Sequence, residues 1–223
     1  MDIQADSLLS LVSIIMIDII LGGDNAVVIA LACRKLPEKQ RIRAIFFGTF
    51  LAIVLRAMLT VVVAYLLKIP FLTLTAGLLL VFIAFQLLIE DRESPNVKAG
   101  GTLAAAIRTI VAADLVMGLD NIVGIAGAAG GNYALIIIGF LFSVPIIVWG
   151  SRILLSLLES FPSLIYIGGG ILVFTAARMI TDTPQFRFWS SGSPHWTYTF
   201  WCTLPLFVLL VSWCINHVSF MRK

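Results

Sequence analysis

Charged side chains are scarce in this chain. Asp, Glu, Lys and Arg make up 12% of its 223 residues, against about 25% in ordinary globular domains, whereas apolar residues make up 60%. A soluble domain of this composition would have too few polar side chains to cover its surface, and a disordered chain would need far more charge. The mean hydropathy of +1.05 therefore indicates an integral membrane protein.

Cysteine and histidine are also rare. Cys33, Cys202 and Cys214 lack the spacing of metal ligands, and we interpret them as small apolar side chains. His195 and His217 lie apart from the acidic residues of the apolar segments, so that no nucleophile–base pair is evident. We therefore expect neither an enzyme nor a resident cofactor. The net charge of +3 is small and scattered, and we expect the lipid bilayer, not nucleic acid, as partner.

The apolar residues form long runs. A membrane-spanning helix needs about 20 mostly apolar residues. Seven segments meet this requirement, at about 8–33, 44–67, 69–89, 104–129, 133–158, 163–181 and 197–218. We therefore predict an all-α membrane protein with seven transmembrane helices in a single transmembrane domain over 1–223.

Basic residues lie mainly in alternate connections between these segments. They are Arg34, Lys35, Lys39, Arg41 and Arg43 in the first connection, Arg92 and Lys98 in the third, and Arg222 and Lys223 at the C-terminus. Because Lys and Arg stay on the cytoplasmic side, the pattern predicts an outside N-terminus and a cytoplasmic C-terminus. An odd number of spans is then required, and seven satisfies this. We expect a multi-pass protein of the cytoplasmic membrane.

The sequence contains an internal repeat. The stretch DIILGGDNAVVIALA, residues 18–32, matches DLVMGLDNIVGIAGA, residues 114–128, at an offset of 96 (114 − 18). The matched pairs are Asp18 with Asp114, Gly22 with Gly118, Asp24 with Asp120, Asn25 with Asn121, Arg56 with Arg152 and, at an offset reduced by four, Pro70 with Pro162 and Gly77 with Gly169. We predict repeat 1 at about 8–89 and repeat 2 at about 104–181, with the seventh helix, 197–218, outside them.

Each predicted repeat has three helices, so the second copy would enter the membrane inverted. Two inverted three-helix repeats plus one extra helix is a common transporter architecture, and its substrate site lies near the midplane, often at broken helices. Gly22 and Gly23 predict such a break in the first helix. In the second copy Leu119 replaces Gly23, so that equal unwinding of the two helices is not expected.

Six charged residues fall inside the predicted spans and away from the span ends. They are Asp18, Asp24, Asp114, Asp120, Arg56 and Arg152. Each costs about 2.5–3.5 kcal/mol at the bilayer centre and must face the bundle interior and a partner. Asp18 and Asn25 share one helix face, and Asp24 points about 120° away unless the helix unwinds.

The oxygen ligands around these charges suit hard cations such as Mg²⁺, Ca²⁺ and Mn²⁺. Three readings remain open for the aspartates: a cation site, a structural network with Arg56 and Arg152, or a proton relay. The arginines are charge partners or contact a substrate carboxylate. Asn25 and Asn121 are ligands or caps of the broken helices.

The paired signatures DIILGGDN and DLVMGLDN, in two three-helix halves plus a seventh helix, resemble the TerC family of integral membrane proteins. The resemblance covers roughly residues 8–182. The family is associated with tellurium resistance by name and, in several members, with manganese export, and it is grouped with the LysE-type exporters. By position, the resemblance implies metal-site residues at Asp18, Asp24, Asn25, Asp114, Asp120 and Asn121, with Asp24 and Asp120 as the central pair.

The sequence thus leads to the hypothesis of a divalent-cation transporter that exports Mn²⁺ by alternating access. Mg²⁺ and Ca²⁺ fit the same ligands, and manganese itself comes from the resemblance. A proton returning on an aspartate would drive export, although no residue pattern shows this coupling. The alternatives are a LysE-type exporter of an amino acid or small organic solute, and a membrane scaffold for the metallation of exported enzymes. The pattern indicates no particular oligomer.

Overall fold

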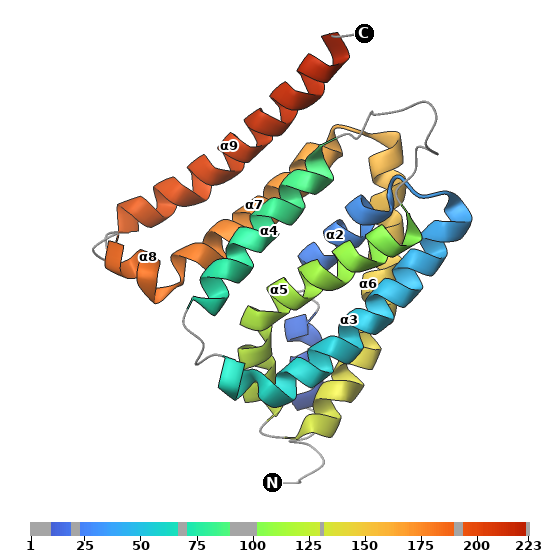
Figure 1. The fold of residues 1–223 in the computed structure, drawn as a ribbon. Helices are drawn as coiled ribbons and strands as arrows, with labels where there is room; N and C mark the ends of the chain where they lie inside the picture. The colour runs from blue at the N-terminus through green and yellow to red at the C-terminus, as the bar shows by residue number, and fades with distance from the viewer. Residues whose placement is uncertain are drawn as a thin grey trace.

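The structure is a computed structural model, and it describes residues 10–18, 23–66, 71–89, 102–129, 132–189 and 194–221. These residues form helices and their connections, without a strand among them (Figure 1). After an N-terminal helix, Ser10–Asp18, the helices are α2 Gly23–Cys33, α3 Glu38–Leu66, α4 Leu72–Leu88, α5 Leu103–Ala129, α6 Tyr133–Ser160, α7 Leu164–Thr181, α8 Pro184–Trp189 and α9 Pro194–Met221.

Apart from a few end residues, the predicted apolar segments are helical where the structure describes them. The first is broken: Ser10–Asp18 and α2 meet at 41° across a short gap. Gly23 begins α2, whereas Gly22 lies outside the described residues. The counterpart α5 continues as a helix through Gly118 and Leu119. The two related helices therefore differ, as the replacement of Gly23 by Leu119 predicts. The short helix α8 was not predicted.

Within the described residues, four helices are long and apolar enough to cross a membrane, namely α3, α6, α7 and α9, and the broken first pair makes a fifth candidate. Helix α4 has 17 residues, and α5 carries Arg108, Asp114 and Asp120. Length and composition thus support a multi-pass membrane protein with four or five candidate spans, whereas seven spans remain a prediction.

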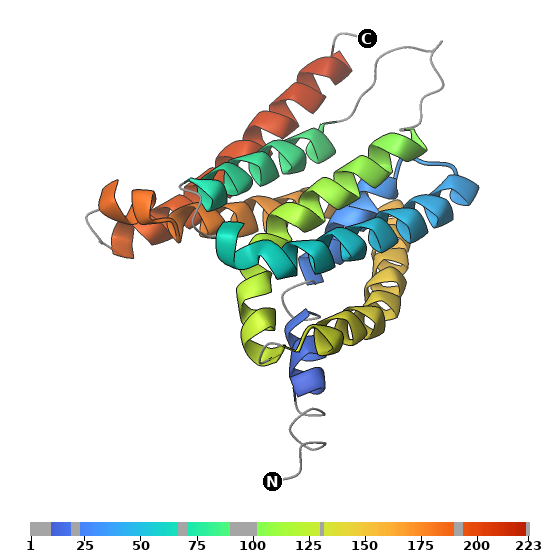
Figure 2. The same cartoon turned by 60° about the horizontal axis from the view of Figure 1, so that its bottom comes forward.

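Helix α2 lies at the centre of the bundle, in contact with α5, α6 and α7 (Figures 1 and 2). Helix α3 runs along α5, α4 runs along α7, and α9 covers α7 and part of α4. The largest core cluster joins α2, α4, α5 and α7 and includes the fully buried Leu80, Leu88 and Leu172. Large apolar side chains such as Phe46, Trp149 and Phe207 are exposed, as expected for surfaces that face lipid.

Glycines set the closest helix contacts. A Cβ atom at Gly77 of α4 would lie under 3.0 Å from Ile180 of α7, and one at Gly169 of α7 would lie equally close to Leu88 of α4. The lower number on one helix faces the higher number on the other, so α4 and α7 are antiparallel. Small residues at such positions allow close approach of membrane helices.

A similar glycine contact joins the other helices. Gly48 of α3 packs against Ile110 of α5, and Gly139 of α6 packs against Ile14 of the N-terminal helix. Added Cβ atoms at both glycines would lie under 3.0 Å from the isoleucine side chains. These contacts hold α3 against α5, and α6 against the first helix, around the buried charges.

Candidate functional site

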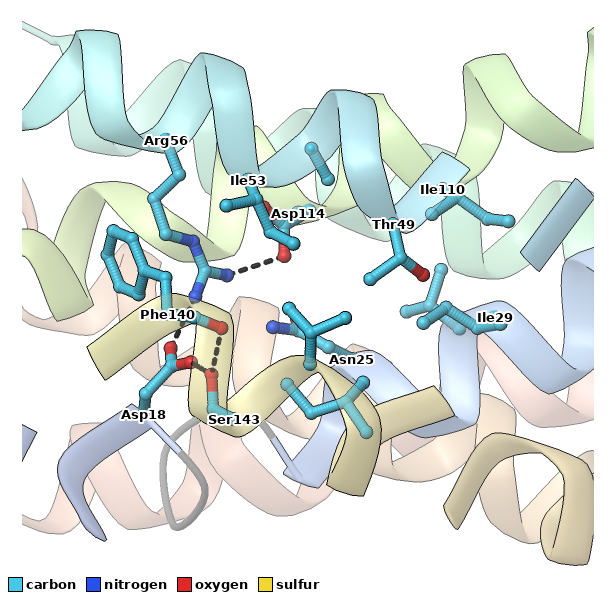
Figure 3. Close-up of a pocket in the computed structure, with 14 residues that line it drawn as sticks. Asp18, Asn25, Ile29, Thr49, Ile53, Arg56, Ile110, Asp114, Phe140 and Ser143 are labelled. Atoms are coloured by element: carbon cyan, nitrogen blue, oxygen red, sulfur yellow. Dashed lines mark hydrogen bonds and ion pairs between the residues drawn. The ribbon is translucent and has the colours of Figure 1, made fainter. Parts of the chain in front are cut away.

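A buried arginine bridges two aspartates, one buried and one largely buried, at the centre of the bundle (Figure 3). Arg56 of α3 donates from Nη1 to Asp18 Oδ1 and from Nη2 to Asp114 Oδ1, at 2.5 Å each. Ser143 of α6 donates its hydroxyl to the second oxygen of Asp18. The side chains of Arg56, Asp18 and Asp114 are 4%, 2% and 14% exposed. Charges buried to this degree require partners, and the bridge supplies them.

The rest of the guanidinium has few polar contacts. Arg56 Nε is buried without a hydrogen-bond partner, and its Cζ lies 5.5 Å from the ring centroid of Phe140, within the range of a cation–π contact. A Cβ atom at Gly118 of α5 would lie 3.3 Å from Nε. Gly118 therefore leaves the space that the arginine side chain occupies.

The bridge closes one end of a cavity of about 30 Å³, which is enough for one or two water-sized occupants. The cavity extends from the bridge past Asn25 and Thr49 to Ile29 and Ile110 (Figure 3). Its lining residues are Asp18, Asn25, Val28, Ile29, Thr49, Ala52, Ile53, Arg56, Ile110, Asp114, Phe140, Ser143, Val144 and Ile147. The cavity therefore lies on the side of the bridge that faces the α2–α3 connection.

Besides Arg56, three residues of this cavity have polar atoms that are buried without a partner. They are Asn25, at both atoms of its amide, Thr49 at Oγ1 and Asp114 at Oδ2. A buried polar atom without a hydrogen bond costs about 1–3 kcal/mol, so a ligand or water that satisfied these atoms would be strongly favoured. The oxygens come from α2, α3 and α5, and amide, hydroxyl and carboxylate oxygens are ligands of hard cations.

Asp24 lies outside the cavity. It stands in the first turn of α2, where Thr175 of α7 donates a hydrogen bond to its Oδ2 at 3.3 Å, and its Oδ1 is buried without a partner. The 120° separation expected for Asp18 and Asp24 on a regular helix agrees with these separate surroundings. In this structure the helix break does not bring Asp24 into the cavity with Asp18.

Three predicted residues remain, and the structure describes the side chain of one of them, Arg152. The side chains of Asp120 and Asn121 lie outside the described residues. Arg152 of α6 is exposed and does not line the cavity, and no ion pair of it is found in the described part of the chain. Within the same part, no group of three or more His, Cys, Asp or Glu side chains is placed to hold a metal ion.

Sequence reasoning missed two cavity residues, Thr49 and Ser143. Hydroxyl side chains in apolar helices usually donate hydrogen bonds to the backbone of their own helix, so their presence does not by itself indicate a site. A signal for Thr49 was nevertheless present, because it precedes Arg56 by seven residues, which places both on one helix face. Ser143 has no such signal.

Arg152 does not line the cavity, whereas Ile147 of the same helix does. The residues of α3 and of α6 that line the cavity have the same spacing along their helices, at an offset of 91 (140 − 49). They are Thr49, Ala52, Ile53 and Arg56 on α3, and Phe140, Ser143, Val144 and Ile147 on α6. The packed glycines Gly48 and Gly139 have the same offset. In the cavity, Ile147 therefore takes the place on α6 that Arg56 takes on α3. At this offset the connection before α6 is one residue shorter than that before α3, and α6 lacks the four residues that begin α3.

Comparison with known proteins agrees with the membrane fold. The chain is 50% identical over 177 residues to the membrane protein YjbE of Bacillus subtilis, covering 79% of this chain and 81% of the relative. It is 24% identical to the membrane protein YkoY of the same organism, over 83% of this chain and 65% of the relative. The UPF0053 protein YegH of Escherichia coli is 23% identical over 77% of this chain and 36% of its own length.

No solved structure matches the chain. The family profile of integral membrane protein TerC matches residues 3–222, nearly the whole chain. Together with the similarity to YjbE, this match establishes that the chain belongs to the TerC family of integral membrane proteins.

Proposed function

We propose that this protein is a divalent-cation transporter that exports Mn²⁺ by alternating access. The observation that carries the proposal is the set of unpartnered oxygens around the buried cavity, at Asn25, Thr49 and Asp114. An amide, a hydroxyl and a carboxylate offer a hard cation a site without soft ligands. Asp18 lies across the same cavity and would add negative charge. Manganese, among the hard cations, follows from the resemblance to family members that export it.

The size of the cavity favours an ion over an organic solute. Its volume is about 30 Å³, whereas an engineered cavity that admits benzene measures about 150 Å³. An amino acid would also need a cationic partner for its carboxylate, but both terminal nitrogens of Arg56 already contact aspartates. In this conformation the cavity suits an ion that has lost most of its water.

The helix contacts support an inverted repeat. Gly77 contacts Ile180, and Gly169 contacts Leu88. The two glycines differ by 92 residues (169 − 77), and so do their two partners (180 − 88), so one contact is the other with the roles of α4 and α7 exchanged. Such reciprocal pairs are the mark of a two-fold relation. Because α4 and α7 are antiparallel, the axis lies across them, as in transporters with inverted halves.

The first two helices of each half give the same result. Ile110 packs on Gly48, and Ile14 packs on Gly139, where the isoleucines are related by 96 and the glycines by 91. The cavity lies between the halves that this relation defines. Rocking of one half against the other would open the cavity to each side of the membrane in turn.

The expected topology fits export. With the α2–α3 connection on the cytoplasmic side, as its basic residues predict, the cavity lies on the cytoplasmic side of the Arg56 bridge. A cation from the cytoplasm would bind at Asn25, Thr49 and Asp114, and the bridge would block its passage outward. Export then requires that the bridge open after the cation has bound.

Purified protein in sealed liposomes tests the proposal. We expect wild-type protein to carry Mn²⁺ down its gradient, and Asp114→Asn to abolish this flux by removing a buried charge from the site. Asp182→Asn provides the matched control, because Asp182 is an exposed carboxylate paired with Arg187. Mg²⁺, Ca²⁺ and Zn²⁺ are tested in parallel, with and without a pH gradient. Absence of flux for every divalent cation, with folded wild-type protein, would contradict the proposal.

A further inference from the structure

Arg56 occupies the carboxylates that a cation in the cavity would also seek. Its guanidinium contacts one oxygen of Asp18 and one of Asp114, which come from opposite halves of the chain. Carboxylate oxygens are the strongest ligands that Mn²⁺, Mg²⁺ or Ca²⁺ finds in a protein. A divalent cation and a guanidinium repel each other, and this repulsion is only weakly screened in a buried site. The two cations therefore compete for the same carboxylates.

The unpartnered atoms of the cavity would hold a cation close to a carboxylate that Arg56 contacts. Asp114 presents Oδ1 to Arg56, whereas its Oδ2 is buried without a partner. Asn25 and Thr49 provide two further unpartnered oxygens in the same cavity. A cation held by these atoms would lie beside the guanidinium, on the same carboxylate. Its binding would weaken the hold of Asp114 on Arg56.

Little besides the two aspartates holds the guanidinium in place. Nε has no hydrogen-bond partner, and the contact with Phe140 is a cation–π contact at 5.5 Å. The neighbouring residue of α5 is Gly118, which has no side chain to confine the arginine. The long arginine side chain can therefore swing away once the carboxylates are claimed by another cation.

The formal charge of the site favours departure of Arg56 when a divalent cation binds. The two aspartates with Arg56 carry a formal charge of −1, and the same aspartates with a divalent cation are neutral if Arg56 leaves. The position on α6 that corresponds to Arg56 holds Ile147, which also lines the cavity. Arg56 is thus the arginine that serves both halves.

We propose that Arg56 is a tethered counter-cation. It holds Asp18 and Asp114 in the empty carrier, is displaced by the transported cation, and returns when the cation leaves. This inference rests on the proposed function. Net efflux, in which the empty carrier must reset, then requires Arg56. Exchange of one bound cation for another does not, because the carrier stays loaded in both directions.

The experiment compares net efflux with exchange in liposomes loaded with radioactive Mn²⁺. For Arg56→Gln we expect net efflux into Mn²⁺-free buffer to fall by roughly tenfold or more, and exchange against external Mn²⁺ to stay within about twofold of wild type. Calorimetry with Mn²⁺ alone should show tighter binding, because the competitor is gone. Arg108→Gln is the matched control, because Arg108 is exposed and does not line the cavity; it should leave all three quantities unchanged.

Two results for folded Arg56→Gln would overturn the inference: unchanged net efflux, or loss of exchange and Mn²⁺ binding together with net efflux. If this variant does not fold, Arg56→Lys and the double variant Arg56→Ile with Ile147→Arg take its place. Both keep one positive charge beside the carboxylates and should sustain net efflux, and failure of both when folded would overturn the inference. Absence of Mn²⁺ binding and flux in the wild type would instead overturn the proposed function, and this inference with it.

Discussion

Thr49 is the residue whose role is least evident from its type. It is buried on α3, its hydroxyl has no partner, and it lines the cavity beside Asn25. Thr60, on the same helix, is also buried, but its hydroxyl donates to the backbone oxygen of Arg56. The two threonines therefore differ: the hydroxyl of Thr49 is free to bind an occupant of the cavity, whereas that of Thr60 is satisfied within its own helix.

We expect Thr49→Val to weaken Mn²⁺ binding by about tenfold, which corresponds to the loss of one oxygen ligand worth about 1.4 kcal/mol. The substitution preserves shape and removes the unpartnered hydroxyl, so folding stability should fall little or rise. Thr60→Val is the control and should leave Mn²⁺ affinity unchanged. Titration calorimetry on both proteins measures the effect, and equal affinities for the two variants would remove Thr49 from the site.

Arg152 provides the opposite case. At a constant offset of 96, Arg152 is the counterpart of Arg56 in the second repeat. In the structure Arg152 is exposed, and Ile147 is the residue of α6 that lines the cavity at the position that Arg56 has on α3. We expect Arg152→Gln to retain Mn²⁺ flux within about twofold of wild type, because exposed charges contribute little. Liposome flux measures it. A loss of flux comparable to that of Asp114→Asn would favour the match of Arg56 with Arg152, at an offset of 96, over the match with Ile147, at an offset of 91.

At the scale of helices, the contact between α4 and α7 depends on glycine at two positions. Gly77 and Gly169 are each within 3.0 Å of a large side chain if a Cβ is added. We expect Gly77→Val and Gly169→Val each to destabilise the protein by about 1–3 kcal/mol, the usual cost of overpacking. Thermal unfolding in detergent measures this. Because both added Cβ atoms would lie under 3.0 Å from a side chain of the facing helix, the two losses should be similar.

Gly150 of α6 is the matched control for these variants, because a Cβ there would meet nothing within 4 Å. Gly150→Val should therefore change stability far less than either substitution at the α4–α7 contact. If Gly150→Val were as destabilising as Gly77→Val, the cost would come from helix propensity and not from packing.

The helices themselves could be predicted from sequence, because long apolar runs leave few alternatives in a membrane. The break in the first helix could be predicted from Gly22 and Gly23, and the burial of Asp18 and Asp114 from the cost of exposing charge to lipid. The part of α6 that lines the cavity could not. Residues that face lipid and residues that face the core are both apolar, so the packing of Gly139 and the place of Ile147 in the cavity are known only from the structure.

The candidate site was only partly predictable for the same reason. Charged residues are costly in an apolar helix, and for this reason Asp18, Asp114 and Arg56 could be predicted to lie in the bundle interior. Thr49 and Ser143 carry no charge and are indistinguishable in sequence from other hydroxyls. Which way Asp24 faces depends on the geometry of the break, and in the structure it faces Thr175 of α7.

At the scale of the whole molecule, the two ends of the bundle are different. The helix that begins at Ser10 starts at one end, and α9 finishes at the other, near the α2–α3 connection (Figure 1). An odd number of membrane crossings would place the chain termini on opposite sides in this way. The basic residues Arg34, Lys35 and Arg41 at that connection predict that its side is cytoplasmic.

Reporter fusions test this topology. A fluorescent protein that matures only in the cytoplasm should fluoresce when fused after Lys223 and remain dark when fused before Met1, and a periplasmic or cell-surface reporter should give the reverse result. Fluorescence from both ends would require an even number of crossings, so that at least one of the seven predicted spans would not cross the membrane. If the helix that does not cross belongs to one of the repeats, the cavity would no longer lie between two inverted halves, and export by alternating access would lose its structural basis even if the chain still bound Mn²⁺.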